Sequence, residues 1–87
     1  MKLPAKSEYA FKAVIELAIR YNGENPIQLN VISDSQEIPK KFLIQILLRL
    51  KSAKIVNSSR GTAGGYFLAK PPSKVSLADV LMAVDDG

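Results

Sequence analysis

The sequence predicts a mainly α-helical fold with a small β-hairpin, a winged helix-turn-helix that forms one domain over residues 1–87. Two patterns lead to this prediction. A short and a longer helical segment meet across a tight turn before Pro39, and two β-prone runs flank a glycine-rich segment. Folding of so short a chain buries only about 60–65% of the surface that the unfolded chain exposes, so the core is small and a partner subunit would help.

The first helix is expected at residues 5–22, with two apolar stripes at helical spacing. The stripe assigned to the core consists of Tyr9, Ala10, Ala13, Val14, Leu17, Ala18 and Tyr21. The second stripe consists of Phe11, Ile15 and Ile19. This second stripe fits equally well a helix that is buried centrally in the domain and a helix that packs against a partner. The helix should end before Gly23, which suits a C-terminal cap.

The remaining line of the first helix is polar. It consists of Glu8, Lys12, Glu16 and Arg20. Each acid stands four residues before a base, an order that stabilises helices. We therefore interpret this line as the polar side of the helix.

A helix-turn-helix follows. Residues 27–29 favour an extended lead-in, and residues 30–35 favour a short helix. Pro39 suits the first turn of the next helix, at residues 39–52, because its missing N–H would be unpaired there anyway. Apolar residues continue at helical spacing along that helix, at Phe42, Leu43, Ile46, Leu47 and Leu50. In a helix-turn-helix, the second helix enters the major groove of DNA.

The wing is expected from two β-prone runs at residues 55–59 and 66–70, separated by a segment that holds three glycines. Pro71 and Pro72 end the second strand, because proline cannot donate to a strand ladder. A last helix is expected at residues 76–85. It starts with a capping box of Ser76 and Asp79, and its apolar face consists of Leu77, Val80, Leu81 and Val84.

Basic residues are concentrated in one part of the chain. Residues 38–78 hold eight Lys or Arg and no Asp or Glu, and all eight carboxylates lie outside this span. The basic residues of the span are Lys40, Lys41, Arg49, Lys51, Lys54, Arg60, Lys70 and Lys74. A block of one charge in a foldable sequence is typical of a surface that meets a polyanion, most commonly nucleic acid.

Two parts of this block have a pattern suited to DNA. Lys41, Gln45 and Arg49 recur every four residues and line one side of the second helix of the pair, where Gln45 suits adenine and Lys41 suits guanine or phosphate. Arg60 stands beside Gly61 where the first wing strand turns, and an arginine on a thin hairpin tip fits a narrow minor groove. Each feature alone is also explained by solvated side chains, but their occurrence together favours DNA binding.

Other classes of function are disfavoured by composition. The chain has no cysteine and no histidine, so disulfides and thiolate or imidazole metal ligands are excluded. Asp85 and Asp86 are adjacent and cannot face each other across a bond, so we predict no enzyme and no catalytic residues. No apolar run reaches the length of a membrane span and no signal peptide is evident, so we expect a cytoplasmic protein.

Two alternatives to DNA binding are a protein-binding winged helix and RNA binding. The first would use the Phe11, Ile15 and Ile19 stripe, and its apolar interface should resist salt, whereas DNA binding should weaken steeply. RNA binding is less favoured, because exposed aromatic side chains for stacking on bases are scarce. Tyr66 and Phe67 lie on strands that also need apolar contacts.

Three segments of the chain carry a resemblance to a known family. They are Lys6 to Tyr9-Ala10, the helix Pro39-Lys40-Lys41-Phe42-Leu43-Ile44-Gln45-Ile46-Leu47, and the wing Ser59-Arg60-Gly61-Thr62-Ala63-Gly64-Gly65-Tyr66-Phe67-Leu68-Ala69-Lys70-Pro71. These segments resemble the IscR/NsrR/CymR family of bacterial transcription regulators. The resemblance covers essentially the whole chain, and its Arg-Gly-x-x-Gly-Gly-Tyr wing pattern is fairly specific.

The resemblance implies a homodimeric regulator, typically a repressor, that binds double-stranded DNA. Its operator would be an imperfect palindrome upstream of genes for iron-sulfur assembly, nitrosative stress or sulfur metabolism. The residues that would then contact bases are Lys41, Gln45 and Arg60. The residues expected to contact the DNA backbone are Lys6, Tyr9, Lys40, Arg49, Ser58, Ser59, Gly61 and Thr62.

The chain departs from the family at three places. Ile44 stands where some members have a carboxylate that reads cytosine, so the operator preference does not carry over. Glu37 stands where a turn glycine is common, and a left-handed backbone there would cost about 1 kcal/mol. Members continue past the helix at Ser76 into a sensor segment, often with cysteines that bind an iron-sulfur cluster, and a long dimerisation helix, whereas this chain stops at Gly87. We expect either a truncated form or a regulator without that sensor, and no cofactor unless a longer form supplies cysteines.

Overall fold

A computed structural model describes residues 3–22 and 25–85. Its elements are α1 (Ala5–Ile19), α2 (Leu29–Gln36), α3 (Lys40–Ser52), β1 (Val56–Ser59), β2 (Gly65–Leu68), the short 3-10 helix η1 (Pro72–Lys74) and α4 (Leu77–Val84). Within the described residues, four α-helices and a two-stranded antiparallel hairpin confirm the predicted winged helix-turn-helix. The cap expected at Gly23 and the terminal Asp86 lie outside the described residues.

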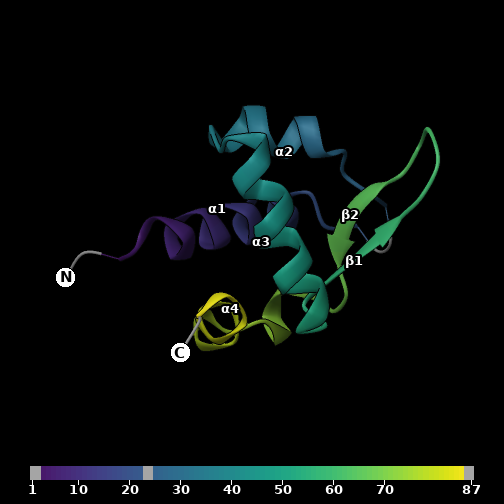
Figure 1. Cartoon of the computed structure of the whole chain (residues 1–87). Helices are drawn as coiled ribbons and strands as arrows, with labels where there is room; N and C mark the ends of the chain where they lie inside the picture. The colour runs from purple at the N-terminus through teal and green to yellow at the C-terminus, as the bar shows by residue number, and fades with distance from the viewer. Residues whose placement is uncertain (1–2, 23–24, 86–87) are drawn as a thin grey trace.

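α1 is the central helix, and α2, α3 and α4 all pack against it (Figure 1). Its core stripe faces inwards, with Ala10, Ala13 and Leu17 buried. The buried side chains contributed by the rest of the fold are Ile32, Ile38, Leu43, Ile46, Leu47, Leu50, Ile55, Val56, Leu68, Val80 and Val84. The two alanines leave room for neighbouring helices to approach α1 closely, so a small domain can pack three helices around one.

The second apolar stripe of α1 is divided between core and surface. Phe11 packs against the core, whereas Ile15 and Ile19 are exposed, Ile19 with 74% of its surface accessible. Of the two interpretations left open for this stripe, burial in the domain thus holds for Phe11, whereas Ile15 and Ile19 remain at the surface. α1 also ends at Ile19, earlier than the expected residue 22, because the N–H of Tyr21 bonds to the Ala18 carbonyl in a tighter final turn.

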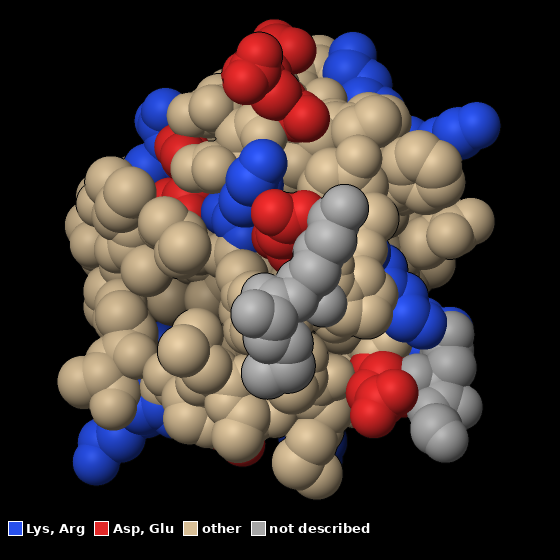
Figure 2. All heavy atoms as spheres, turned by 90° about the vertical axis from the view of Figure 1, so that its left-hand side faces the viewer, with Lys and Arg blue, Asp and Glu red and all other residues tan. Residues whose placement is uncertain are grey.

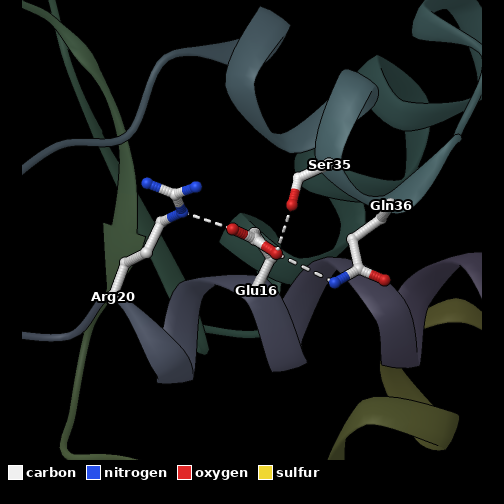
Figure 3. A network of polar contacts seen from close by, with 4 residues as sticks. All are labelled: Glu16, Arg20, Ser35 and Gln36. Carbon is white, nitrogen blue, oxygen red and sulfur yellow. Dashed lines mark hydrogen bonds and ion pairs between the residues drawn. The ribbon is translucent and has the colours of Figure 1, made fainter.

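The polar line of α1 is also divided, because Glu16 is buried. Its carboxylate accepts hydrogen bonds from the guanidinium of Arg20, the residue that follows α1, and, at 2.9 Å each, from the Ser35 hydroxyl and the Gln36 amide at the end of α2 (Figure 3). The Arg20 hydrogen bond, assisted by those from Gln36 and Ser35, outweighs burial and lowers the pKa of Glu16 below its usual value of 4.5. The predicted pair of Glu16 with Arg20 is confirmed, but Glu16 is buried and also joins α1 to α2.

The turn between α2 and α3 depends on Glu37, which adopts the left-handed conformation with φ 53° and ψ 48°. The next residue, Ile38, is buried, and its N–H donates to the Ser33 carbonyl oxygen at 3.0 Å. The Ser33 hydroxyl donates to the Ile38 carbonyl oxygen at 2.6 Å. Both backbone groups of Ile38 are thus paired inside the core, and the left-handed residue lets the chain turn sharply into α3.

The wing is joined to the start of the helix-turn-helix. β1 and β2 pair from Val56 opposite Leu68 to Ser59 opposite Gly65. The extended lead-in to α2 adds a bridge, in which Ile27 N–H donates to the Tyr66 carbonyl at 2.7 Å and Tyr66 N–H donates back at 2.8 Å. Gly65 is required by this close approach, because a Cβ there would come within 2.4 Å of the Ile27 carbonyl oxygen.

The capping box predicted for the last helix is confirmed. Asp79 N–H donates to the Ser76 hydroxyl at 3.0 Å, and Ser76 N–H donates to the Asp79 carboxylate at 3.3 Å. Val80 and Val84 are buried against the core, but Leu77 is 71% exposed. The apolar face of α4 is therefore narrower than predicted, and part of it is left at the surface.

Candidate nucleic-acid interface

The side of α3 that points away from the core carries the polar residues picked out from the sequence. Lys41, Gln45 and Arg49 are exposed, and the opposite side of the helix is buried. The buried residues of α3 are Leu43, Ile46, Leu47 and Leu50. Helical periodicity therefore separates a surface line from a core line, and the core line holds the helix against α1.

Aromatic stacking joins the beginning of α3 to α1. The rings of Tyr9 and Phe42 stack with centroids 6.0 Å apart and an angle of 21° between their planes. The Lys41 ammonium lies 5.2 Å from the centroid of the Phe42 ring. Phe42 is 42% exposed, although it shares the helical spacing of the buried apolar residues. It instead brings Tyr9 of α1 and Lys41 of α3 together.

A mainly apolar groove of about 390 Å³ lies between the beginning of α1 and α3. It is lined by Pro4, Ala5, Lys6, Tyr9, Phe42, Gln45 and Ile46. Three residues predicted to contact DNA, Lys6, Tyr9 and Gln45, are therefore on one surface although they are far apart in the sequence.

The wing tip forms a second hollow, of about 430 Å³, with the start of α2. It is lined by Gln28, Leu29, Asn30, Ser58, Ser59, Arg60, Gly61, Thr62, Gly64, Gly65 and Tyr66. Arg60 and Thr62 are exposed, and Gly61 has a φ of 100°, which favours glycine. The Gln28 amide donates to the Thr62 carbonyl oxygen at 3.2 Å and so connects the tip to α2.

A second hydrogen bond connects the wing to α3. The ammonium of Lys51, near the end of α3, donates to the Ser58 hydroxyl of β1 at 2.7 Å. Since the hydroxyl oxygen accepts from Lys51, its own hydrogen is available for another acceptor. The wing is thus held to both helices of the helix-turn-helix.

The sequence did not indicate the contacts by which Gln28, Phe42 and Lys51 join elements, nor the place of Asn30 in the hollow at the wing tip. The order short helix, turn, longer helix would have indicated that the start of α2 lies near the DNA, which is a signal for Gln28 and Asn30. No sequence pattern indicates the contact of Phe42 with Tyr9 or of Lys51 with Ser58. Both contacts depend on how separate elements pack.

One side of the molecule carries charges of both signs. Figure 2, which faces the left-hand side of Figure 1, shows a surface made mostly of uncharged residues, with acidic and basic side chains both present. The beginning of α1 and α4 lie on this side of the fold (Figure 1). This side therefore carries charges of both signs.

The comparisons with known proteins agree on one family. The model of the Rrf2 family, described as an iron-dependent transcriptional regulator, matches residues 3–87. IscR of Photorhabdus laumondii is 38% identical over 86 residues, which are 99% of this chain and 52% of that protein. IscR of Serratia proteamaculans is 37% identical over 86 residues, again 99% of this chain and 52% of that protein. The chain thus spans about half the length of these relatives, which are transcriptional regulators and not enzymes.

Solved structures give the same result. IscR of T. potens has a TM-score of 0.90 and 32% identity, over 98% of this chain and 61% of that one. CymR, the global cysteine regulator of B. subtilis, has a TM-score of 0.90 and 30% identity, over 100% of this chain and 67% of that one. The winged helix is therefore shared with both regulators.

Iron does not fit the residues of this chain. The sequence has neither cysteine nor histidine, and the part that the structure describes has no group of three acidic side chains that could hold a metal ion. Nor does any helix in the described ranges have the length and apolar character to cross a membrane.

Proposed function

The chain belongs to the Rrf2 family of DNA-binding transcriptional regulators, and we propose that it binds its operator with α3 in the major groove and the wing in the minor groove. The observation that carries the proposal is the exposed line of Lys41, Gln45 and Arg49 on the side of α3 opposite the core. A major groove admits an α-helix, and its base edges present the acceptors and donors that lysine and glutamine side chains bind.

Base recognition falls to three side chains in this proposal. Gln45 offers an amide that can pair with adenine, and Lys41 offers an ammonium to guanine acceptors. Arg60, exposed on the wing tip, enters the minor groove, where a narrow groove concentrates negative potential. The hydrogen bonds from Gln28 and Lys51 support this division of roles, because they hold the wing at a fixed position beside α3.

Backbone contacts would surround these three residues. We assign Lys40 and Arg49 of α3, Lys6 and Tyr9 of α1, and Ser58, Ser59, Gly61 and Thr62 of the wing to phosphates. Ser58 is well suited, because its oxygen accepts from Lys51 and its hydroxyl hydrogen can be donated to a phosphate oxygen.

We further propose that two copies bind a palindromic operator in the bacterial cytoplasm. Ile15 and Ile19 on α1 and Leu77 and Met82 on α4 are exposed apolar side chains, which supports a protein partner on these helices. The same exposure supports the alternative of a protein-binding module. A DNA-binding regulator should bind a specific DNA sequence, whereas a protein-binding module should not.

Three substitutions test the proposed roles, with an operator selected from random-sequence DNA. Gln45→Ala should relax specificity at one base pair of each half-site, with a loss of about 1–3 kcal/mol in discrimination against the wrong base.

Lys40→Ala should weaken binding to all sequences alike, and the slope of log affinity against log salt concentration should become shallower by about one. Arg60→Ala should reduce operator affinity and the preference for A·T pairs at the minor-groove position.

The readout is equilibrium binding by fluorescence anisotropy, with the protein-to-operator ratio measured in the same titrations. Two copies per palindrome are expected. An Arg60→Ala variant with unchanged operator affinity would show that the wing assignment is wrong, and one copy per palindrome would contradict the dimer.

A further inference from the structure

Two apolar side chains lie within the polar surface of α3. Ile44 is 42% exposed and Leu48 is 60% exposed. Together with Lys41 and Gln45 they occupy positions i, i+3, i+4 and i+7, which share one side of a helix. The exposed side of α3, which also carries Arg49, therefore includes apolar as well as polar side chains.

The exposure of Ile44 brings no evident benefit to the fold. Isoleucine is less favourable in a helix than unbranched residues, because its β-branch restricts the side chain against the preceding turn. The side chains that hold α3 to the core lie on the opposite side of the helix. An apolar side chain at this position is explained better by an apolar contact made outside the described fold.

The major groove presents one apolar group to such a side chain, the 5-methyl group of thymine. We propose that Ile44 recognises a thymine methyl in each half-site, which rests on the proposed function and adds a base that Lys41 and Gln45 do not specify. Their polar groups bind hydrogen-bonding atoms of neighbouring bases, whereas Ile44 selects for the methyl group.

Ile44 is favoured over Leu48 by its place in the helix. It is the fifth residue of α3, which starts at Lys40, and residues near the beginning of a recognition helix contact base edges. Leu48 stands one turn further along on the same side. It serves as a matched control, because it is also apolar and exposed.

The test replaces thymine by deoxyuridine, which lacks only the methyl group. The probe is the operator duplex selected by the full 87-residue chain from random-sequence DNA, with each thymine replaced in turn. At one thymine per half-site the wild-type affinity should fall about fourfold, the factor that corresponds to loss of one buried methyl group. Ile44→Ala should bind both duplexes equally, and Leu48→Ala should still prefer thymine.

Thermal unfolding of Ile44→Ala checks that the exposed position is not structural, with a midpoint close to the wild type expected. The inference is overturned if no thymine is sensitive to its methyl group, or if Ile44→Ala keeps the preference. Both of these results are compatible with sequence-specific operator binding, so the proposed function would stand. Absence of sequence-specific binding by the wild type would instead overturn the proposed function together with this inference.

Discussion

Glu16 shows how one buried side chain can connect two helices. Its carboxylate accepts hydrogen bonds from Arg20, just after α1, and from Ser35 and Gln36 on α2. A buried charge is tolerated only when it is paired and its remaining lone pairs are bonded. Here all the partners are donors, so the ionised form is the one that the site stabilises, and the pKa of Glu16 is lowered accordingly.

Replacement of Glu16 by glutamine should destabilise the fold. The amide has the size of the carboxyl group, but its NH₂ group faces donors and its oxygen carries no charge. We expect a loss of about 1–3 kcal/mol in the free energy of unfolding at pH 7, measured by urea denaturation. Glu8→Gln on the exposed side of α1 is the matched control and should change it by less than about 0.5 kcal/mol.

The difference between wild type and Glu16→Gln should depend on pH. Because the folded-state pKa lies below the usual 4.5, the stabilisation is complete well above pH 4.5 and is lost as the pH falls through the folded-state value. The two proteins should therefore approach equal stability in acid. A difference that is constant from pH 7 down to pH 3 would show that the charge of Glu16 is not what matters.

At the scale of elements, both helices of the helix-turn-helix end with a left-handed, charged residue. Glu37 follows α2 with a φ of 53°, and Lys54 follows α3 with a φ of 64°. In each case the next residue is a buried isoleucine, Ile38 or Ile55, whose N–H returns to a carbonyl five residues earlier. The left-handed backbone of the first residue directs the following isoleucine into the core.

Glycine at position 37 should therefore stabilise the protein. Removal of the Cβ relieves a left-handed strain of about 1 kcal/mol, partly offset by the greater flexibility of glycine in the unfolded chain. We expect Glu37→Gly to raise the free energy of unfolding by about 0.5–1 kcal/mol. Glu37→Ala also removes the charge but keeps the Cβ, so it is the control. Equal free energies of unfolding for Glu37→Gly and Glu37→Ala would contradict an explanation by left-handed strain.

The type and order of the elements could be predicted because each has a local signal. Ser76 and Asp79 marked the start of α4, whereas Pro39, expected in the first turn of the helix, is the residue that precedes α3. The end of α1 was less well predicted, because a 3-10-type turn at Tyr21 leaves no distinct signal in the residues. Local sequence signals therefore predict where an element starts more reliably than they predict which of its faces is buried against the core.

The faces of the elements were predicted less well, since burial depends on neighbours. Phe11 is covered by the core and Leu77 is not, although both follow an apolar helical pattern. Phe42 has the spacing of a core residue but stacks on Tyr9 at the surface. For the candidate site, the sequence was sufficient to place Lys41, Gln45 and Arg49 on one exposed side of α3, but not to find the hydrogen bonds that hold the wing.

At the scale of the whole molecule, hydrogen bonds at three places connect the wing to the helix-turn-helix. Ile27 pairs with Tyr66, Gln28 bonds to the wing tip, and Lys51 bonds to Ser58. These contacts fix the position of Arg60 relative to α3. If α3 lies in the major groove and Arg60 in the adjacent minor groove, the distance along the DNA between the base pairs that they contact should be fixed. Each half-site of the operator should then show one constant spacing between these two groups of base pairs.

The central claim is most directly tested by the salt dependence of wild-type binding to the selected operator and to a scrambled duplex. DNA binding through lysine and arginine contacts should weaken about a thousandfold between 50 and 200 mM salt, the loss for about six phosphate contacts, three from each of two copies, with the operator bound more tightly throughout. The contrary result is an affinity that does not change with salt, or equal affinity for the two duplexes. Either would contradict a sequence-specific DNA-binding role for α3 and the wing.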